Sequence, residues 1–410
     1  MRPAASLVTS SDLRRLSRRD FLVGSALGLL CITSRPTHRT HGGESQLDDE
    51  LLYVGTYTEG DRTDGIHLVR MNTRSGELRR VGSVSAGANP SFLAIHPNGR
   101  VLYAVNEVTE RDGKPTGAVS AFAIARDTGG LTLLNEQASG GGAPCYVSVD
   151  RHGRALLVAN YVGGNVALLP VRADGALRAA THVAQHRGAG PNAARQEAPH
   201  AHCIVADPSN RFALAADLGI DRVLVYRLDL DGGSLRHVEG GDAQLRPGAG
   251  PRHLAFHPSL PLVFVANELD STVTTLRFDE ERGTLSPLQT LSALPAGWTG
   301  TSYVADVHVA PSGRTLYVSN RGHNSIAVFS VDPSSGALAL EEVVSTDGDW
   351  PRNFSLDPTG RWLLVANQRS ASVVVFARDR ESGRLTPTEQ RLAVPSPVCL
   401  RFRAHVGVTT

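Results

Sequence analysis

The chain is built from a repeated unit of two short strands joined by a tight turn. One copy, residues 250–269, reads GPRHLAFHPSLPLVFVANEL. Leu254 and Phe256 alternate with other residues, and a short apolar run follows a turn that contains Pro258 and Pro261. Proline presets φ and cannot donate to a strand ladder, so this spacing predicts a turn between two strands. The dense turns and alternating apolar residues exclude a solenoid of helix pairs.

The unit recurs at intervals typical of one propeller blade. A polar residue closes the second strand of each copy, at Asn106, Asn160, Asp217, Asn267, Asn320 and Asn367. Neighbouring members of this series are 47 to 57 residues apart. Each copy continues with a third strand, a turn rich in Asp, Ser and Gly, and a fourth strand that begins with Leu, as in residues 325–340. Four short strands with a period of about 40–55 residues indicate a β-propeller.

The two ends of the repeat region complete one more blade. Residues 51–57 resemble a second strand without its first strand, and residues 396–402 resemble a first strand without the rest. Pairing of these strands would close the ring and remove exposed strand edges. The sequence therefore predicts an all-β fold, a seven-bladed β-propeller closed by pairing of its N- and C-terminal strands.

The residues before the repeats have the pattern of a targeting segment. Arg18 and Arg19 precede an apolar run over residues 21–33, which resembles a twin-arginine export signal. The run is short for a transmembrane helix, and Cys31 lies in a poor match to a lipidation motif. We therefore assign residues 1–47 to an export signal and linker and residues 48–410 to the propeller. We expect a periplasmic or extracellular protein with no membrane span in its mature form.

Composition argues against nucleic-acid binding and gives the cysteines no special role. The formal net charge is +1 and no basic stripe occurs, so nucleic-acid binding is not expected. There is no CxxC motif, and Cys145, Cys203 and Cys399 lie in apolar strands, where cysteine is usually a small buried hydrophobic residue.

The ends of the inner strands are the candidate functional positions, because a propeller brings them together around one mouth of its channel. The residues that follow the closing polar residue vary in type: Tyr57, Glu107, Tyr161, Leu218, Glu268, Arg321 and Gln368. His200 and His202 begin one first strand and would share a face. They fit a base or substrate contact, a structural pair or two metal ligands, but no further ligands occur at metal-site spacing. The polar connection from Ala179 to Ala198 should border the same mouth.

Arginines occupy matching positions in other units. Arg252 and Arg352 both follow proline at the start of a first strand, and Arg321 follows Asn320. Guanidinium groups suit a carboxylate, a phosphate or a developing oxyanion. The alternative for each arginine is an ion pair between blades.

Several of these stretches resemble one known family. GPNAARQEAPHAH, GPRHLAFHP, VFVANEL, LYVSNRGHNSIAVF and WPRNFSLDPTGRWLLVANQ are similar to the bacterial lactonase family. That family includes cycloisomerase-type 6-phosphogluconolactonases and is related to carboxy-cis,cis-muconate cyclase. The resemblance implies a seven-bladed propeller without an obligatory metal or cofactor. The resemblance to the muconate cyclase branch also implies a site of one His, two Arg and one Glu, which fall on His202, Arg252, Arg321 and Glu268.

The resulting hypothesis is metal-independent hydrolysis of a sugar lactone, a small-molecule substrate, by a monomer. His202 would act as general base, Glu268 would orient it or share that role, and Arg252 would stabilise the oxyanion. Arg321, with His200 and Arg352, would bind the substrate. The alternatives are a non-catalytic exported propeller that binds a ligand or partner, and an isomerase that forms a lactone from an unsaturated dicarboxylate.

Overall fold

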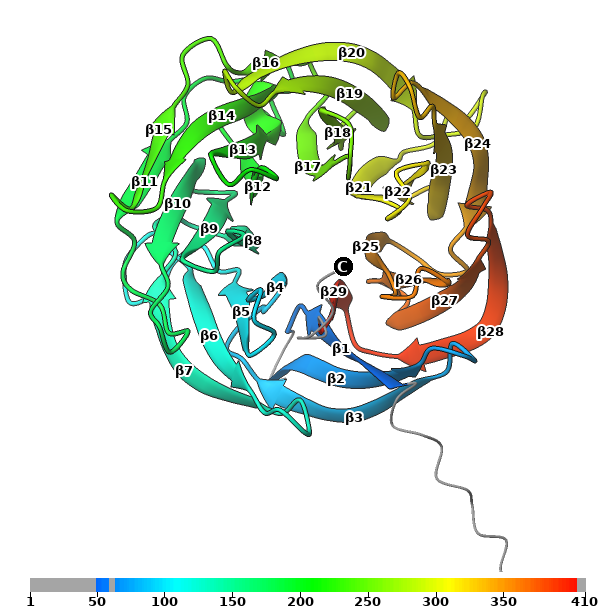
Figure 1. Ribbon diagram of the computed structural model, residues 1–410, viewed down its shortest axis with the longest axis horizontal. Helices are drawn as coiled ribbons and strands as arrows, with labels where there is room; N and C mark the ends of the chain where they lie inside the picture. Colours follow the sequence, from blue (N-terminus) through cyan, green and yellow to red (C-terminus); the bar gives the residue numbers. More distant parts are fainter. Residues whose placement is uncertain (1–48, 59–62, 404–410) are drawn as a thin grey trace, which may run out of the picture. The chain divides into compact units, whose positions relative to one another are not determined.

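The chain forms a ring of seven sheets. The computed structural model describes residues 49–58 and 63–403, which contain 29 strands, one short 3-10 helix η2 (Leu218–Ile220) and no α-helix. The strands form seven sheets around a common centre (Figure 1). This confirms the predicted all-β, seven-bladed propeller. No helix in the described ranges is long and apolar enough to cross a membrane. The predicted export signal and linker, residues 1–47, lie outside the described residues.

We number the blades in chain order and give each from its innermost to its outermost strand. Blade 1 contains β29 (Pro397–Phe402), β1 (Asp49–Thr56), β2 (Asp64–Asn72) and β3 (Leu78–Ser85). Blade 2 contains β4 (Leu93–Ile95), β5 (Val101–Asn106), β6 (Ala118–Ile124) and β7 (Leu131–Ala138). Blade 3 contains β8 (Pro144–Val149), β9 (Ala155–Asn160), β10 (Asn165–Pro170) and β11 (His182–Gln185).

Blade 4 contains β12 (Ala201–Ala206), β13 (Phe212–Asp217), β14 (Arg222–Asp229) and β15 (Ser234–His237), with β16 (Ala243–Gln244) also paired to β14. Blade 5 contains β17 (Pro251–Phe256), β18 (Leu262–Asn267), β19 (Thr272–Asp279) and β20 (Thr284–Ser292). Blade 6 contains β21 (Tyr303–Val309), β22 (Thr315–Arg321), β23 (Ser325–Val331) and β24 (Leu338–Ser345). Blade 7 contains β25 (Pro351–Leu356), β26 (Trp362–Asn367), β27 (Ser372–Arg378) and β28 (Leu385–Ala393).

The second strand of each blade is apolar because neighbouring blades cover both of its faces. All six residues of β18 are buried. Val263 and Val265 pack into the apolar cluster shared with blade 4, whereas Phe264 packs into the cluster shared with blade 6. This division follows the two-residue period of a strand. Burial of each such side chain contributes roughly 1.5–3 kcal/mol. The outermost strands instead expose much of their length, as in β28, whose polar residues and Pro387 protect the edge.

The first and last described strands close the ring. β1 pairs with β29 in antiparallel register, with Val54 opposite Leu400. The pairing continues beyond the ladder, where the Tyr57 amide donates to the Ser396 carbonyl at 3.2 Å. In Figure 1 the two strands lie side by side, although they come from opposite ends of the chain. The predicted closure is therefore confirmed.

Candidate active site

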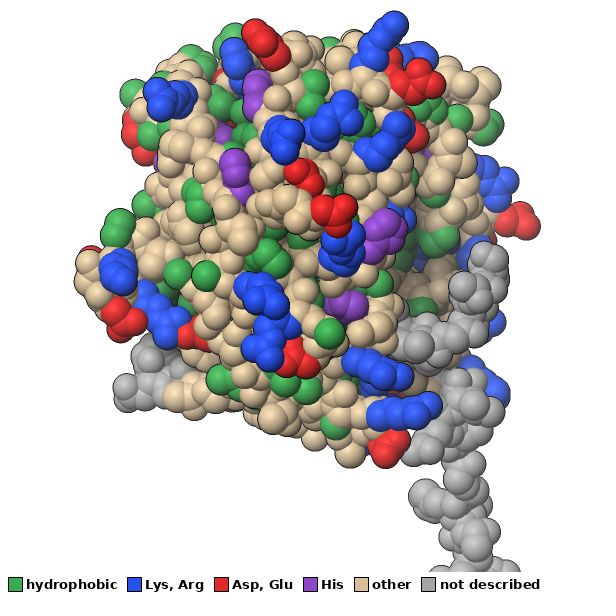
Figure 2. Space-filling view, turned by 60° about the vertical axis from the view of Figure 1, so that its left-hand side comes forward, with side chains coloured by type: hydrophobic (Ala, Val, Ile, Leu, Met, Phe, Trp, Pro, Cys, Tyr) green, Lys and Arg blue, Asp and Glu red, His purple; other side chains and the backbone are tan. Residues whose placement is uncertain are grey.

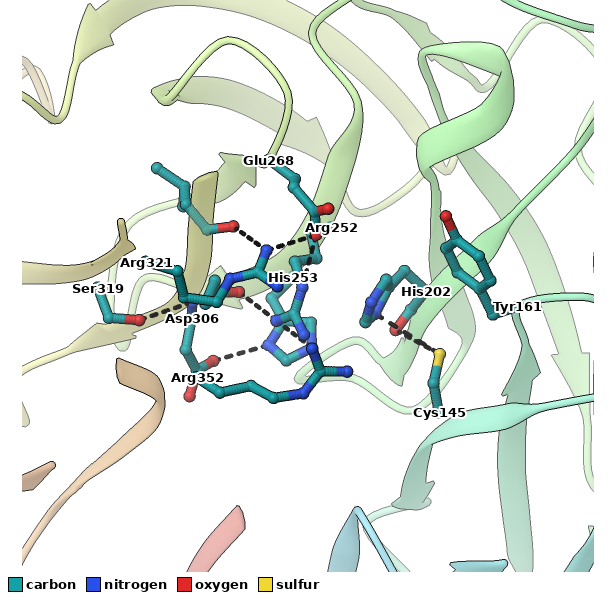
Figure 3. A network of polar contacts seen from close by, with 12 residues as sticks. Cys145, Tyr161, His202, Arg252, His253, Glu268, Asp306, Ser319, Arg321 and Arg352 are labelled. Atoms are coloured by element: carbon teal, nitrogen blue, oxygen red, sulfur yellow. Dashed lines mark hydrogen bonds and ion pairs between the residues drawn. The ribbon is translucent and has the colours of Figure 1, made fainter. Parts of the chain in front are cut away.

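A recurrent backbone irregularity positions the inner side chains of the site. In five blades the residue before the first proline of the unit has a positive φ: Asn89, Ala143, Gly250, Trp350 and Ser396. One strand residue is then bulged out of register in each of several blades, at Cys145, His202, Arg252 and Arg352. A β-bulge re-aims its side chain. These four side chains, from blades 3, 4, 5 and 7, converge on one region (Figure 3).

Glu268 lies at the centre of an arginine cluster. It directly follows β18, and its carboxylate contacts three guanidinium groups. Arg195 Nη2 lies 2.6 Å from Oε1, while Arg321 Nη2 and Arg252 Nε lie 2.7 Å and 3.0 Å from Oε2. Burial alone would raise the pKa of Glu268, but the three arginines outweigh burial and hold this pKa well below its usual range. Glu268 is therefore an ionised partner of arginines, and it makes no hydrogen bond to His202 within the described residues.

The two buried arginines keep unused donor groups. Arg252 Nη1 donates to the Ala305 carbonyl, and Arg321 Nη2 donates to the Val304 carbonyl at 3.1 Å. Arg252 Nε is close to Glu268 but not aligned for a hydrogen bond, and Arg321 Nε has no hydrogen-bond partner in the described part of the chain. Trp350 supports this group, with its ring centre 5.5 Å from Arg321 Cζ and 3.5 Å from Arg369 Cζ. Fixed cationic donors of this kind can bind an anion or an oxyanion.

His202 lies beside this cluster without joining it. Its side chain is buried, and its Nδ1 atom lies 3.6 Å from Cys145 Sγ. The rings of Tyr161 and His253 meet it edge to face at 5.5 Å and 5.4 Å between centres. Burial, followed by the charges of Arg252, His253 and Arg352, lowers the pKa of His202 well below its usual value. His202 is therefore neutral at pH 7, and the nearby positive charges make it a weaker base than an ordinary histidine.

His200 is fixed in place by hydrogen bonds and by ring stacking. Its Nδ1 atom lies 3.0 Å from the Tyr161 carbonyl oxygen and its Nε2 atom 3.0 Å from Glu197 Oε1. Its backbone amide donates to Asp217 Oδ1 at 2.7 Å, and its ring stacks on Tyr161 at 4.4 Å. His200 and His202 thus both contact Tyr161, but both ring nitrogens of His200 already have partners.

A second polar group forms another part of the site around Arg352. Arg352 Nη2 donates to the Tyr57 hydroxyl at 2.8 Å, and this hydroxyl lies 2.9 Å from Glu107 Oε2. Ser91 Oγ donates to the same Glu107 oxygen. Tyr57 and Glu107 occupy the positions after the second strands of blades 1 and 2, which the repeat pattern had singled out. Arg352 makes no ion pair with Glu268, although its charge contributes to the pKa shifts of His202 and Arg252.

The connection into blade 4 reaches the site through Arg195, a residue that sequence reasoning missed. Arg195 is 35% exposed, lies 3.4 Å from the Tyr161 hydroxyl and sits over the ring of Tyr303. The stretch of residues 179–198 thus borders the site, as expected. However, that stretch is not wholly a connection, because it contains β11, the outermost strand of blade 3. Short polar strands of this type have no apolar alternation that would reveal them.

Next to the arginine cluster, Asp306 joins three blades. Its Oδ1 atom accepts from His253 Nδ1 at 2.8 Å, and its Oδ2 atom contacts His308 and Asn353. Asn353 in turn accepts from the Leu400 amide at 2.7 Å. Asp306 therefore links blades 5, 6 and 7 directly and blade 1 through Asn353, and His253 connects this network to Arg252 Nη1 at 3.2 Å.

The arginines of the site contrast with the charge pattern on one outer face of the molecule. On the face seen in Figure 2, basic and acidic side chains are interspersed. In the site, Arg195, Arg252, Arg321 and Arg352 face the two carboxylates of Glu107 and Glu268. Within the described ranges, no group of three or more His, Cys, Asp and Glu side chains is arranged to hold a metal ion.

One large cavity lies away from this group of residues. A cavity of about 1080 Å³ is lined by residues at the opposite ends of the strands of blades 1–3, including Arg70, Asn98, Arg100 and Arg403. None of the residues that converge around His202 borders it. We place the functional site at the arginine cluster, because perturbed titratable groups and unpartnered guanidinium donors lie together there.

Comparisons with known proteins agree on one family. Residues 51–402 match the family described as "Lactonase, 7-bladed beta-propeller". A protein of Bacillus subtilis named 6-phosphogluconolactonase is 41% identical over 354 residues, which cover 86% of this chain and 98% of that protein. A Formosa agariphila protein of the same name is 35% identical, with coverage of 75% and 86%.

A solved structure is equally similar. The periplasmic gluconolactonase of Pseudomonas aeruginosa superposes with a TM-score of 0.81 at 37% identity, covering 87% of this chain and 99% of that one. The family match over residues 51–402 includes His202, Arg252, Glu268 and Arg321. The chain therefore belongs to the lactonase family of seven-bladed β-propellers.

Proposed function

We propose that this protein hydrolyses a sugar lactone, an intramolecular carboxylic ester, and that it prefers a lactone with an anionic substituent. The observation that carries the proposal is a neutral, buried His202 beside an arginine cluster that exceeds its carboxylates in charge. Relatives with 41% and 37% identity are named 6-phosphogluconolactonase and gluconolactonase, and their names support the same class of reaction.

Ester hydrolysis requires an activated water and stabilisation of an oxyanion. In the proposed reaction, His202 removes a proton from water while the oxygen of that water bonds to the lactone carbonyl carbon. Arg252 donates to the oxygen that becomes negative. The bond from the carbonyl carbon to the ring oxygen then breaks, and the protonated His202 returns its proton to that oxygen. The product is an open-chain hydroxy acid, whose carboxylate remains near the arginines.

Glu268 has a supporting role in this proposal. Its low pKa and its three ion pairs make it a poor base, so its expected role as a partner of His202 is replaced. It holds Arg252 and Arg321 in fixed positions, and fixed donors stabilise developing charge without reorganisation. Arg195 and Arg321 are the proposed binders of a substrate phosphate or carboxylate. Arg352, with Tyr57 and Glu107, is the proposed contact for hydroxyl groups of the sugar.

The proposal includes export of the protein. The support is the Arg18–Arg19 pair before an apolar run, and the P. aeruginosa relative is described as periplasmic. An exported enzyme would meet lactones other than the phosphorylated intermediates of the cytosol, so the substrate test must include both kinds.

The test is a pH-stat assay of the purified protein on aldonolactones with and without phosphate. Base consumption above the rate of spontaneous hydrolysis is expected, because each opened lactone releases a proton, together with a higher kcat/KM for the phosphorylated form. His202→Gln should lower kcat by roughly 10²–10⁴-fold if it removes the base. His237→Gln is the matched control, because His237 is half-exposed on blade 4, where it pairs with Asp242 and contacts the ring of Tyr226. The proposal fails if no lactone opens above background, or if His202→Gln retains parental activity.

A further inference from the structure

Cys145 occupies a functional position rather than an ordinary core position. It is the bulged residue of blade 3, and the equivalent residues of blades 4, 5 and 7 are His202, Arg252 and Arg352. Its side chain is buried and its sulfur contacts the ring of His202 (Figure 3). The apolar strand around it had indicated a simple hydrophobic role, which does not explain this contact.

The surroundings of the sulfur determine which way its hydrogen bonds run. Besides His202 Nδ1 at 3.6 Å, Cys145 Sγ has three neighbours, the carbonyl oxygens of Ala159 at 3.8 Å and of Ala201 and His202 at 3.7 Å. Carbonyl oxygens only accept, and a thiol has a single proton. If that proton went to Nδ1, the sulfur lone pairs would face three carbonyl oxygens with no donor between them. A thiol proton directed at one of these carbonyl oxygens, with Nδ1–H donating to sulfur, gives both the thiol and Nδ1 a partner of the right kind.

The other ring nitrogen of His202 is then the free one. Nε2 makes no hydrogen bond within the described residues, whereas Nδ1 has the sulfur as its partner. In a neutral imidazole only one nitrogen carries a proton, and its hydrogen bond decides which. The groups that face the ring from other blades are Arg252 and His253 of β17, Arg352 of β25 and Tyr161 after β9. None of them accepts a hydrogen bond from Nε2.

We infer that Cys145 is a positioning residue that holds His202 as the Nδ1–H tautomer, so that Nε2 is the atom that accepts the proton of water. This inference deepens the proposed lactone hydrolysis and rests on it for its catalytic meaning. It also separates Cys145 from the nucleophilic cysteines, because burial raises the pKa of its thiol and a thiolate would face three carbonyl oxygens.

Nitrogen NMR of the whole protein labelled with ¹⁵N-histidine tests the tautomer directly. Protonated and unprotonated ring nitrogens resonate far apart, and the signal of His202 among the 15 histidines is assigned by its loss in His202→Gln. The wild type should show a protonated Nδ1 and an unprotonated Nε2. Cys145→Ala should populate the Nε2–H form. Its kcat should fall by about tenfold or more, but by less than the kcat of His202→Gln, which lacks the base.

A conservative variant distinguishes positioning from packing and from covalent catalysis. In Cys145→Ser the hydroxyl meets the same carbonyl oxygens and can also accept from Nδ1, so the tautomer and most of kcat should be kept. Cys399→Ala removes another buried thiol, which accepts from the Leu93 amide, and should leave the His202 signals unchanged. If Cys145→Ala does not fold, Cys145→Val offers a similar volume without an acceptor.

Three results would overturn the inference. These are a wild-type Nε2–H signal, an unchanged tautomer in both apolar variants, and loss of activity in Cys145→Ser together with an acylated Cys145 in the wild type. The NMR result does not require turnover. If the protein opened no lactone, the proposed function would fail, while the comparison of tautomers would still decide the inference.

Discussion

Arg321 Nη2 lies 2.7 Å from Glu268 Oε2, and each of these two side chains is only 5% exposed. The same oxygen faces Arg252 Nε at 3.0 Å, so one carboxylate oxygen is shared by two buried guanidinium groups. Two like charges would repel each other in this space without the carboxylate between them. Glu268 therefore maintains the geometry of the arginines, and its removal should affect stability as well as activity.

The first prediction concerns Glu268→Gln. Breaking a buried ion pair on one side leaves uncompensated charge and costs about 3–5 kcal/mol in the free energy of unfolding. Denaturant unfolding monitored by tryptophan fluorescence would measure this loss. Glu197→Gln is the control, because Glu197 is 56% exposed and its pair with His200 should contribute no more than about 1 kcal/mol. Equal, small losses in both variants would contradict the structural role of Glu268.

The second prediction concerns Arg195, the most exposed arginine of the cluster. If Arg195 binds an anionic substituent, Arg195→Ala should raise KM for a phosphorylated lactone by about 10- to 100-fold, as expected for loss of a charged hydrogen bond. The same variant should change KM little for the unphosphorylated lactone. Arg187→Ala, an exposed change in the same connection, is the control. An equal loss for both lactones would show that Arg195 acts only through Glu268.

The fold was predictable because each blade repeats the same local chemistry. The prolines at the turns, the apolar second strands and the polar residue that ends each of them, such as Asn267, recur at one period. Pairing of β1 with β29 followed from two incomplete units, since each strand needs a partner for its backbone groups. β11 was missed, because a four-residue strand with alternating partial exposure has no distinctive pattern.

The site was predictable in position but not in its contacts. Repeat alignment selected His202, Arg252, Glu268 and Arg321, which do lie close together. It did not show that Glu268 pairs with arginines instead of with His202, because pairing depends on which side chains the bulges turn inward. Cys145 shares the repeat position of Arg252, and this alignment was the one signal that could have marked it. Arg195 lies outside the repeat, and no periodic signal marks it.

The third prediction concerns ring closure. A chain that ends at Pro395 lacks β29 and leaves β1 unpaired along one edge, so it should lose cooperative thermal unfolding or unfold at a much lower temperature. A chain that ends at Arg403 keeps every residue of the β1–β29 ladder and is the control. Differential scanning calorimetry compares the two. Similar unfolding temperatures would show that closure contributes little to stability.

The fourth prediction concerns export. Replacing Arg18 and Arg19 together by lysine keeps the charge but removes the arginine pair, so the protein should accumulate in the cytoplasm. Immunoblotting of cytoplasmic and periplasmic fractions would show this retention. The control is the pair Arg14→Lys with Arg15→Lys, which leaves Arg18 and Arg19 in place. An unchanged periplasmic yield of the Arg18/Arg19 variant would refute export by this route.

The last prediction concerns the pH dependence of turnover. A general base works only when unprotonated, so kcat/KM falls as the pH drops through its pKa in the free enzyme. Burial and the charges of Arg252, His253 and Arg352 lower the pKa of His202 well below 6.5. The acid limb of the profile should therefore lie below the range of an ordinary histidine, and activity should stay level between pH 8 and that range. A neutral lactone is required as substrate, because a phosphate ester itself titrates near pH 6.

Arg352→Met sharpens this test. Loss of the positive charge should make protonation of His202 easier, raise its pKa and move the acid limb to higher pH. Arg369→Met is the matched control, because Arg369 stacks on Trp350 and does not contribute to the pKa shift of His202. Stopped-flow measurements with a pH indicator, corrected for spontaneous hydrolysis, give the profiles. A wild-type limb near 6.5, or a limb that Arg352→Met leaves in place, would mean that another group accepts the proton.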